Sequence, residues 1–151
     1  MNQLKQKLQN DLNDAIKSRN TVVAETVRML LAAITNEEVA GKEKKELSDA
    51  EVITVLTREA KKRREAAEAF EQGGRADKAA AERAEGEVIA TYLPEQLSDA
   101  ELNQLITETI AAVGASGPGD MGKVMGALKA KVAGKADGAT VSNLVKAALA
   151  K

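Results

Sequence analysis

The segment YLPEQLSDAEL, residues Tyr92–Leu102, decides how the chain is organised. Pro94 has no amide hydrogen and disfavours helical geometry in the residue before it, so a helix that approaches from the N-terminal side must end here. Further on, Ser98 and Glu101 stand three residues apart, which is the spacing of a capping box at the start of a new helix. The segment therefore predicts a boundary between two helical parts, with YLPEQ as a hinge.

Upstream of Pro94, apolar residues recur three and four positions apart, which is the spacing of amphipathic helices. The pentapeptide LSDAE also occurs at residues 47–51, and we interpret both copies as local capping signals, because the sequences that follow them share only amphipathicity. Gly41 and the Gly73-Gly74 pair are predicted to end helices. This part should hold four helices, at about residues 4–16, 21–40, 49–72 and 76–92.

Downstream of Pro94, the pattern predicts three more helices. They cover about residues 99–113, Met121 to Val132, and 139–150, and Gly114 ends the first of them. No segment alternates apolar and polar residues with a period of two, so no sheet is expected. The predicted fold class is all-α, with a four-helix body (residues 1–94) followed by a small three-helix tail domain (95–151).

The composition excludes several kinds of chemistry. The 151 residues include no Cys and no His, which excludes disulfides, imidazole catalysis and Cys/His zinc sites, and we expect neither a metal nor a cofactor. The net charge is −1, from 22 basic and 23 acidic residues, so we expect no DNA binding and only a local nucleic-acid patch. Without a signal peptide or a membrane-spanning apolar run, a soluble cytoplasmic protein with no membrane association is expected.

The stretch GPGDMGKV (Gly117–Val124) is spaced almost like a phosphate-binding P-loop. A P-loop follows a strand, and its lysine precedes Ser or Thr, whereas a predicted helix precedes this stretch and Val124 follows the lysine. Asp120 would also put a carboxylate where phosphate binds. We therefore interpret Asp120 as a helix N-cap, and Gly122 and Gly126 as a small-residue face that lets another helix approach closely.

Four longer segments resemble one known family. Residues 120–149, DMGKVMGALKAKVAGKADGATVSNLVKAAL, are similar to the C-terminal signature of the GatB/YqeY family, and residues 28–39, 59–75 and 92–102 resemble its other landmarks in the same order. The family comprises free-standing YqeY-like proteins and the homologous tail of the B subunit of tRNA-dependent amidotransferase. The resemblance spans nearly the whole chain and leaves no room for the catalytic cradle of that subunit, which implies the free-standing form.

The resemblance also implies a function. In the Glu-tRNA(Gln)/Asp-tRNA(Asn) amidotransferase, the homologous region engages tRNA at its elbow, whereas the carbon–nitrogen ligase chemistry, with glutamine as amido donor, belongs to other domains. We therefore expect a non-catalytic accessory protein whose partner is tRNA or a tRNA-dependent enzyme. The alternatives are a helical protein–protein interaction module and, least supported, carbon–nitrogen ligase activity as part of a complex. The oligomeric state is left open.

Basic residues form two candidate RNA-binding patches, of which the first is in the tail. From Gly114 onward, six lysines stand against Asp120 and Asp137, a local excess of six minus two, or +4. Lys123 and Lys135 lie where loops meet predicted helix N-termini, which favour anions. No aromatic residue is present there to stack on a base, so recognition would rely on phosphates and backbone shape; the alternative is an ordinary lysine-rich surface. The six are Lys123, Lys129, Lys131, Lys135, Lys146 and Lys151.

The second patch lies on the predicted helix at residues 49–72. Lys61, Lys62 and Arg64 lie on its outer face or at the edge of that face and are candidate phosphate contacts. Glu65 and Glu68 share the face and weaken its positive field. The alternative is a solvated helix surface with i,i+4 pairs such as Lys61–Glu65.

Arg63 and Glu38 differ from these residues because each falls within the apolar stripe of its helix. A charge in such a position requires a partner. We predict a Glu38–Arg63 ion pair that joins the second and third helices. The alternative is that Arg63 lines a groove for RNA or a partner protein.

Overall fold

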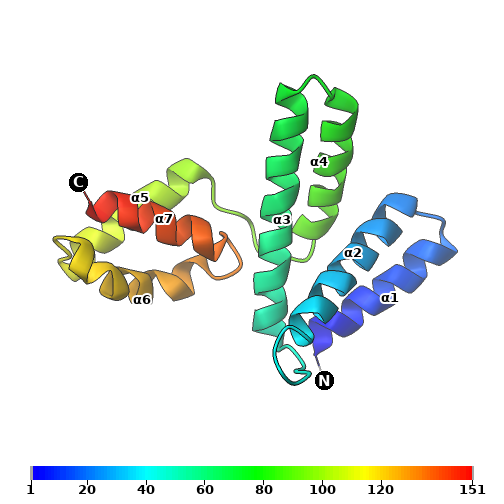
Figure 1. Ribbon diagram of the computed structural model, residues 1–151, viewed down its shortest axis with the longest axis horizontal. Helices are drawn as coiled ribbons and strands as arrows, with labels where there is room; N and C mark the ends of the chain where they lie inside the picture. The colour runs from blue at the N-terminus through cyan, green and yellow to red at the C-terminus, as the bar shows by residue number, and fades with distance from the viewer. Residues whose placement is uncertain (1, 151) are drawn as a thin grey trace. The chain divides into compact units, whose positions relative to one another are not determined.

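The computed structural model describes residues 2–150, which form seven α-helices and a short 3-10 helix without any strand, so the all-α prediction is confirmed. The chain divides into two compact units, one ending at Pro94 and the other beginning at Glu95 (Figure 1). Among the described residues, no helix is long and apolar enough to cross a membrane.

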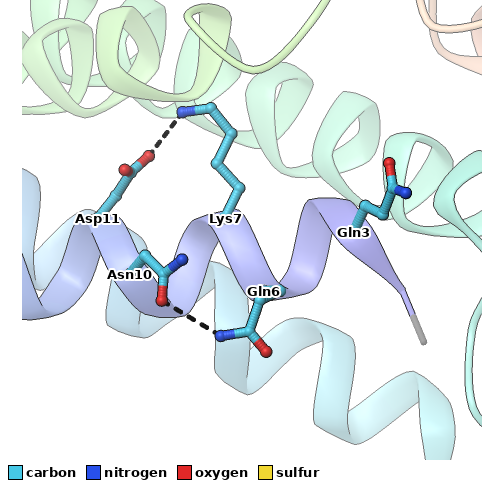
Figure 2. A pocket seen from close by; sticks show the side chains of 5 residues that line it. All are labelled: Gln3, Gln6, Lys7, Asn10 and Asp11. Carbon is cyan, nitrogen blue, oxygen red and sulfur yellow. Dashed lines mark hydrogen bonds and ion pairs between the residues drawn. The ribbon is translucent and has the colours of Figure 1, made fainter.

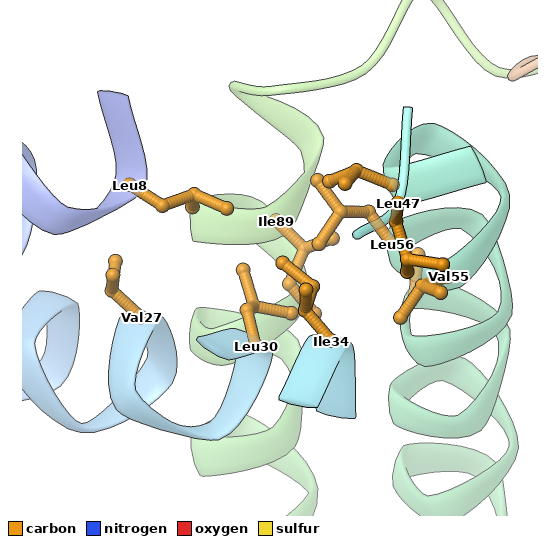
Figure 3. Close-up of a cluster of buried hydrophobic side chains, with 10 residues drawn as sticks. Leu8, Val27, Leu30, Ile34, Leu47, Val55, Leu56 and Ile89 are labelled. Atoms are coloured by element: carbon orange, nitrogen blue, oxygen red, sulfur yellow. The ribbon is translucent and has the colours of Figure 1, made fainter. Parts of the chain in front are cut away.

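The N-terminal unit consists of two helical hairpins. Helix α1 (Gln3–Lys17) packs against α2 (Thr21–Glu38), and α3 (Asp49–Gln72) packs against α4 (Ala76–Ala90) (Figure 1). Helix α3 begins with the capping box predicted at Ser48, whose side chain accepts a backbone N–H. The apolar stripes of all four helices meet in one core, as Figure 3 shows, which consists of Leu8, Val27, Leu30, Ile34, Leu47, Val52, Val55, Leu56, Ala60 and Ile89.

The α3–α4 hairpin extends beyond this core with a different kind of contact. The seam between its helices there buries Ala67 and Ala79 in place of large apolar side chains. Gly86 also faces α3, since a Cβ added to it would lie 3.8 Å from the Cβ of Arg63. Small residues bury little apolar surface, so this half of the hairpin relies on close backbone approach and on ion pairs.

The C-terminal unit is a three-helix arrangement with its own core. Helices α5 (Asp99–Val113), α6 (Met121–Val132) and α7 (Gly138–Leu149) each contribute one apolar stripe. The predicted capping box at Ser98 starts α5, and Gly114 ends it at φ +67°, a left-handed conformation that favours glycine. The core residues are Leu102, Ile106, Val124, Leu128, Val132, Val141, Val145 and Leu149.

Candidate nucleic-acid interface

The tail lysines lie at the surface of the C-terminal unit. Lys123, Lys129 and Lys131 are on α6, Lys135 is in the turn after α6, and Lys146 is on α7; all five are exposed. Within residues 2–150, none of the five forms an ion pair. Lys151, the sixth lysine of the predicted patch, lies outside the described residues. Five positive charges on this surface are therefore open to an external anion.

The three lysines of α6 do not share one face. At about 100° per residue, Lys123 and Lys129 are about 120° apart, on the side of the helix that faces away from the core. Gly126 lies between them. Lys131 lies on the flank of the helix, about 80° around the axis from Lys123. The structure thus brings two lysines to the outward face of α6 and spreads the others along its edge, its terminal turn and α7.

The two glycines of α6 lie on this outward face. Gly122 and Gly126 are exposed, and a Cβ added to either would meet no atom within 4 Å. No helix within residues 2–150 therefore approaches these glycines closely, and the predicted small-residue face is not used for packing there. Packing within the unit uses the opposite side of α6, where Val124 and Leu128 are fully buried. The glycines leave the outward backbone of α6 uncovered between Lys123 and Lys129.

Asp120 occupies the N-cap position of α6 but does not cap it. A 3-10 turn, Pro118–Asp120, precedes the helix, and Asp120 has φ −95° and ψ 7°, away from the extended geometry that directs a capping side chain at the first amides. Its carboxylate instead accepts the backbone N–H of Ser116 at 2.8 Å. This bond lowers the pKa of Asp120, helped by Gly117 N–H and Lys123. The Asp120 carboxylate thus binds backbone amides at the start of the P-loop-like stretch, those of Ser116 and Gly117.

The start of α7 is likewise filled by an acidic side chain. Asp137 is the N-cap, and its carboxylate accepts the backbone N–H of Thr140 at 3.1 Å. Lys135 does lie in the loop before a helix N-terminus, as expected, but the first turn of that helix already holds the carboxylate of Asp137. Any phosphate bound near this turn would be held by lysine side chains, because Asp137 already complements the helix dipole.

Most cations of the second patch, on α3, are already neutralised. Lys61 pairs with Glu65 at 3.8 Å, as the alternative of a solvated helix surface expects, and Lys62 pairs with Glu59 at 3.6 Å. Arg64 is exposed and forms no ion pair within the part of the chain that the structure describes. The pattern of paired charges matches the solvated-face interpretation better than an RNA-binding patch.

Glu38 is buried, as predicted, but its partner is Lys5. Only 3% of its side chain is exposed, and Lys5 Nζ lies 2.8 Å from its carboxylate. The hydrogen bond from Lys5 lowers the pKa of Glu38, against the opposing effect of burial, and the N–H of Leu47 adds to the lowering. The carbonyl of Glu38 accepts the N–H of Lys45 at 2.9 Å. Glu38 therefore ties the end of α2 to α1 and to the charged connector before α3.

Arg63 is partly buried and pairs across the α3–α4 seam. Its guanidinium lies 3.3 Å from the carboxylate of Glu82 and 3.4 Å from that of Glu85. The predicted Glu38–Arg63 pair is therefore wrong. Helical periodicity showed correctly that both residues face the interior, but it carries no information on which helix covers each face. Helix α1 covers Glu38, and α4 covers Arg63.

A cluster that the sequence did not reveal joins α1 to the end of α4. Lys7 pairs with Asp11 at 2.9 Å, and Tyr92 donates its hydroxyl to Asp11 at 2.6 Å. Burial, together with the Asp11 carboxylate, raises the pKa of Tyr92. Figure 2 shows Lys7 and Asp11 reaching toward each other over a shallow hollow along α1, where Gln6 donates to Asn10. Since these side chains pair with one another, we interpret the cluster as structural.

The fold and the surface together define a class: an all-helical protein of two units, whose C-terminal unit presents unpaired lysines. The chain belongs to the YqeY-like protein family, whose model matches residues 5–149. This family is homologous to the C-terminal region of the B subunit of tRNA-dependent amidotransferase. The chain is also similar to an uncharacterized protein of Schizosaccharomyces pombe, with 36% identity over 89 residues, which covers 58% of this chain and 70% of that protein.

Proposed function

We propose that the protein is a non-catalytic accessory protein that binds tRNA, alone or on a tRNA-dependent enzyme, through the lysines of its C-terminal unit. The observation that carries the proposal is the contrast between the two basic patches. The exposed lysines of α6, its terminal turn and α7 form no ion pair among the described residues, whereas Lys61 and Lys62 of α3 do. Unpaired lysines release the counterions of a phosphate backbone without first breaking a bond within the protein.

The arrangement suits recognition of folded RNA by its backbone. From Lys123 to Lys131, the rise of α6 spreads its lysines along about 12 Å, a span of several phosphates. The uncovered backbone at Gly122 and Gly126 leaves room for a phosphate strand between Lys123 and Lys129. The unit contains no aromatic side chain for base stacking. Binding should therefore be sensitive to salt and only weakly sensitive to sequence.

The test is a titration of tRNA binding against salt concentration. The variant Lys123→Glu/Lys135→Glu reverses two unpaired lysines, and Lys61→Glu/Lys62→Glu is the matched control, with the same change in net charge on the paired patch. We expect the wild-type plot of log K against log salt to be steep, and the Lys123/Lys135 variant to be shallower by about 1.5 to 2. The control should keep the wild-type slope. An equal decrease of the slope in the two variants would contradict the assignment of tRNA binding to the C-terminal unit.

A second candidate function is a docking module for a helix of a partner protein, because Gly122 and Gly126 leave one face of α6 uncovered. That function predicts no salt-dependent tRNA binding at all, and it predicts a protein partner whose binding is lost on Gly126→Leu.

Formation of a side-chain amide on misacylated tRNA by the purified chain, with ATP and glutamine, would contradict the non-catalytic part of the proposal.

A further inference from the structure

The turn that carries Lys135 has a defined backbone conformation. Lys135 donates its N–H to the carbonyl of Val132 at 2.9 Å, which closes a four-residue turn. Ala133 has φ −55° and ψ 119°, and Gly134 has φ +73°, the values of a type II turn. Glycine is favoured at the third position because that residue must adopt a positive φ. The turn sets the direction in which the chain leaves α6.

Two residues just after the unit boundary hold this turn from outside. Gln96 donates its side-chain amide to the carbonyl of Gly134 at 2.6 Å, and Leu97 donates its backbone N–H to the carbonyl of Lys135 at 2.9 Å. On the other side of Lys135, Asp137 caps α7 through Thr140. The backbone of Lys135 is therefore fixed on both sides, while its side chain is exposed.

These two hydrogen bonds also affect the electrostatics of the turn. A carbonyl oxygen carries partial negative charge, which repels a nearby phosphate and competes for the ammonium group of a neighbouring lysine. Gln96 and Leu97 each donate an N–H to one of the two backbone carbonyls at this point, those of Gly134 and Lys135, and so partly offset their negative charge. A lysine on a fixed backbone also loses less conformational freedom when it binds.

We propose that Gln96 is a positioning residue for RNA binding, which acts by holding the turn that presents Lys135 to phosphate. The inference rests on the proposed function, because it concerns the same lysine surface. Gln96 itself need not touch RNA. Among the polar contacts of this turn, the bond from Gln96 is the one that a side-chain substitution removes without changing a lysine or a helix cap.

The experiment is a double-mutant cycle on the full chain, with tRNA binding measured at low salt for wild type, Gln96→Ala, Lys135→Ala and the double variant. Loss of the hydrogen bond from Gln96 to the Gly134 carbonyl, which orders the turn, predicts binding about threefold to tenfold weaker for Gln96→Ala. In the Lys135→Ala background, the same substitution should have little effect, because there is no longer a lysine to position. Gln104→Ala is the control, since Gln104 is an exposed glutamine on α5 whose side chain donates a hydrogen bond to Glu108 on the same helix.

The outcomes separate the two proposals. If Gln96→Ala weakens binding equally with and without Lys135, Gln96 acts on the general fold of the unit and the positioning role is wrong. If Lys135→Ala weakens binding but Gln96→Ala does not, this inference fails while the proposed function stands. If the wild type shows no salt-dependent binding, the proposed function itself fails. Gln96→Asn, which keeps the amide but shortens the side chain, provides a second variant if the alanine variant does not fold, and helix content by circular dichroism monitors folding in each case.

Discussion

Replacing Glu38 by alanine tests how much one buried ion pair stabilises the N-terminal unit. The substitution removes a charge-assisted hydrogen bond from Lys5, at 2.8 Å and with 3% of the Glu38 side chain exposed, which contributes about 1.5 to 3 kcal/mol. It also removes the acceptor of the Leu47 N–H, a further ~1 kcal/mol. Removing a negative charge from the C-terminal end of α2, where the helix dipole disfavours it, offsets about 0.5 kcal/mol of this loss. The expected net loss in the free energy of unfolding is about 2 to 3.5 kcal/mol.

Glu37 is the matched control because it is the preceding residue of the same helix. Its side chain is 46% exposed and pairs with Arg58 at 3.2 Å. Glu37→Ala changes helix propensity and the dipole term as Glu38→Ala does, but an exposed pair contributes only about 0 to 1 kcal/mol. The difference between the two variants therefore isolates the buried contacts of Glu38.

Urea unfolding is the assay, followed through Tyr92. The chain has one tyrosine and no tryptophan, so tyrosine fluorescence reports on the N-terminal unit, in which Tyr92 bonds to Asp11. Glu38→Ala should lower the unfolding midpoint clearly, and Glu37→Ala should leave it nearly unchanged. Equal midpoints for the two variants would refute the assignment of a buried, stabilising Lys5–Glu38 pair.

The pH dependence gives a second check on the same pair. The pKa of Glu38 in the folded protein lies below its ordinary value of 4.5, chiefly because Lys5 donates a hydrogen bond to it. A group with a lowered pKa contributes stability that is present above its unfolded pKa and is lost as the pH falls through its folded pKa. The difference in free energy of unfolding between wild type and Glu38→Gln should therefore be constant near neutral pH and become smaller as the pH falls below 4.5. A difference that grows in acid would contradict the lowered pKa of Glu38.

Three further predictions follow from particular contacts. Arg63→Met leaves Glu82 and Glu85 without a cation, so the half of the α3–α4 hairpin that extends beyond the core should lose about 1 to 2 kcal/mol of stability. Its amide hydrogens should therefore exchange faster with solvent. Exchange in the C-terminal unit should stay unchanged. Burial and the Asp11 carboxylate raise the pKa of Tyr92, so its phenolate absorbance should appear at higher pH than that of free tyrosine, and Asp11→Asn should move the midpoint down; an unchanged midpoint would show that Asp11 has no effect on it. Gly126→Ala should stabilise the C-terminal unit by up to ~1 kcal/mol, because Gly126 is helical and a Cβ there meets no atom. Gly134→Ala should destabilise the unit by about 1 kcal/mol, because Gly134 has a positive φ. Thermal melts that reversed this order would contradict the assigned backbone conformations.

Local signals explain why much of the fold could be predicted. The capping boxes at Ser48 and Ser98, and the glycine that ends α5, act through atoms within a few residues of each other, so their sequence spacing is sufficient evidence. Asp120 shows the limit of this reasoning. Its residue type and position suit an N-cap, but the preceding 3-10 turn changes its backbone angles and sends its carboxylate to Ser116.

The amino-acid sequence by itself determined the helices, the break at Pro94, the inward face of Glu38 and Arg63, and the excess of lysine in the tail, because periodicity, caps and composition are local properties. Only the tertiary structure decided which partners these charges have. Glu38 pairs with Lys5, Arg63 pairs with Glu82 and Glu85, and the five described tail lysines form no ion pair among the described residues. The physical reason is that pairing depends on which helices pack together, and many different packings share one pattern of apolar stripes.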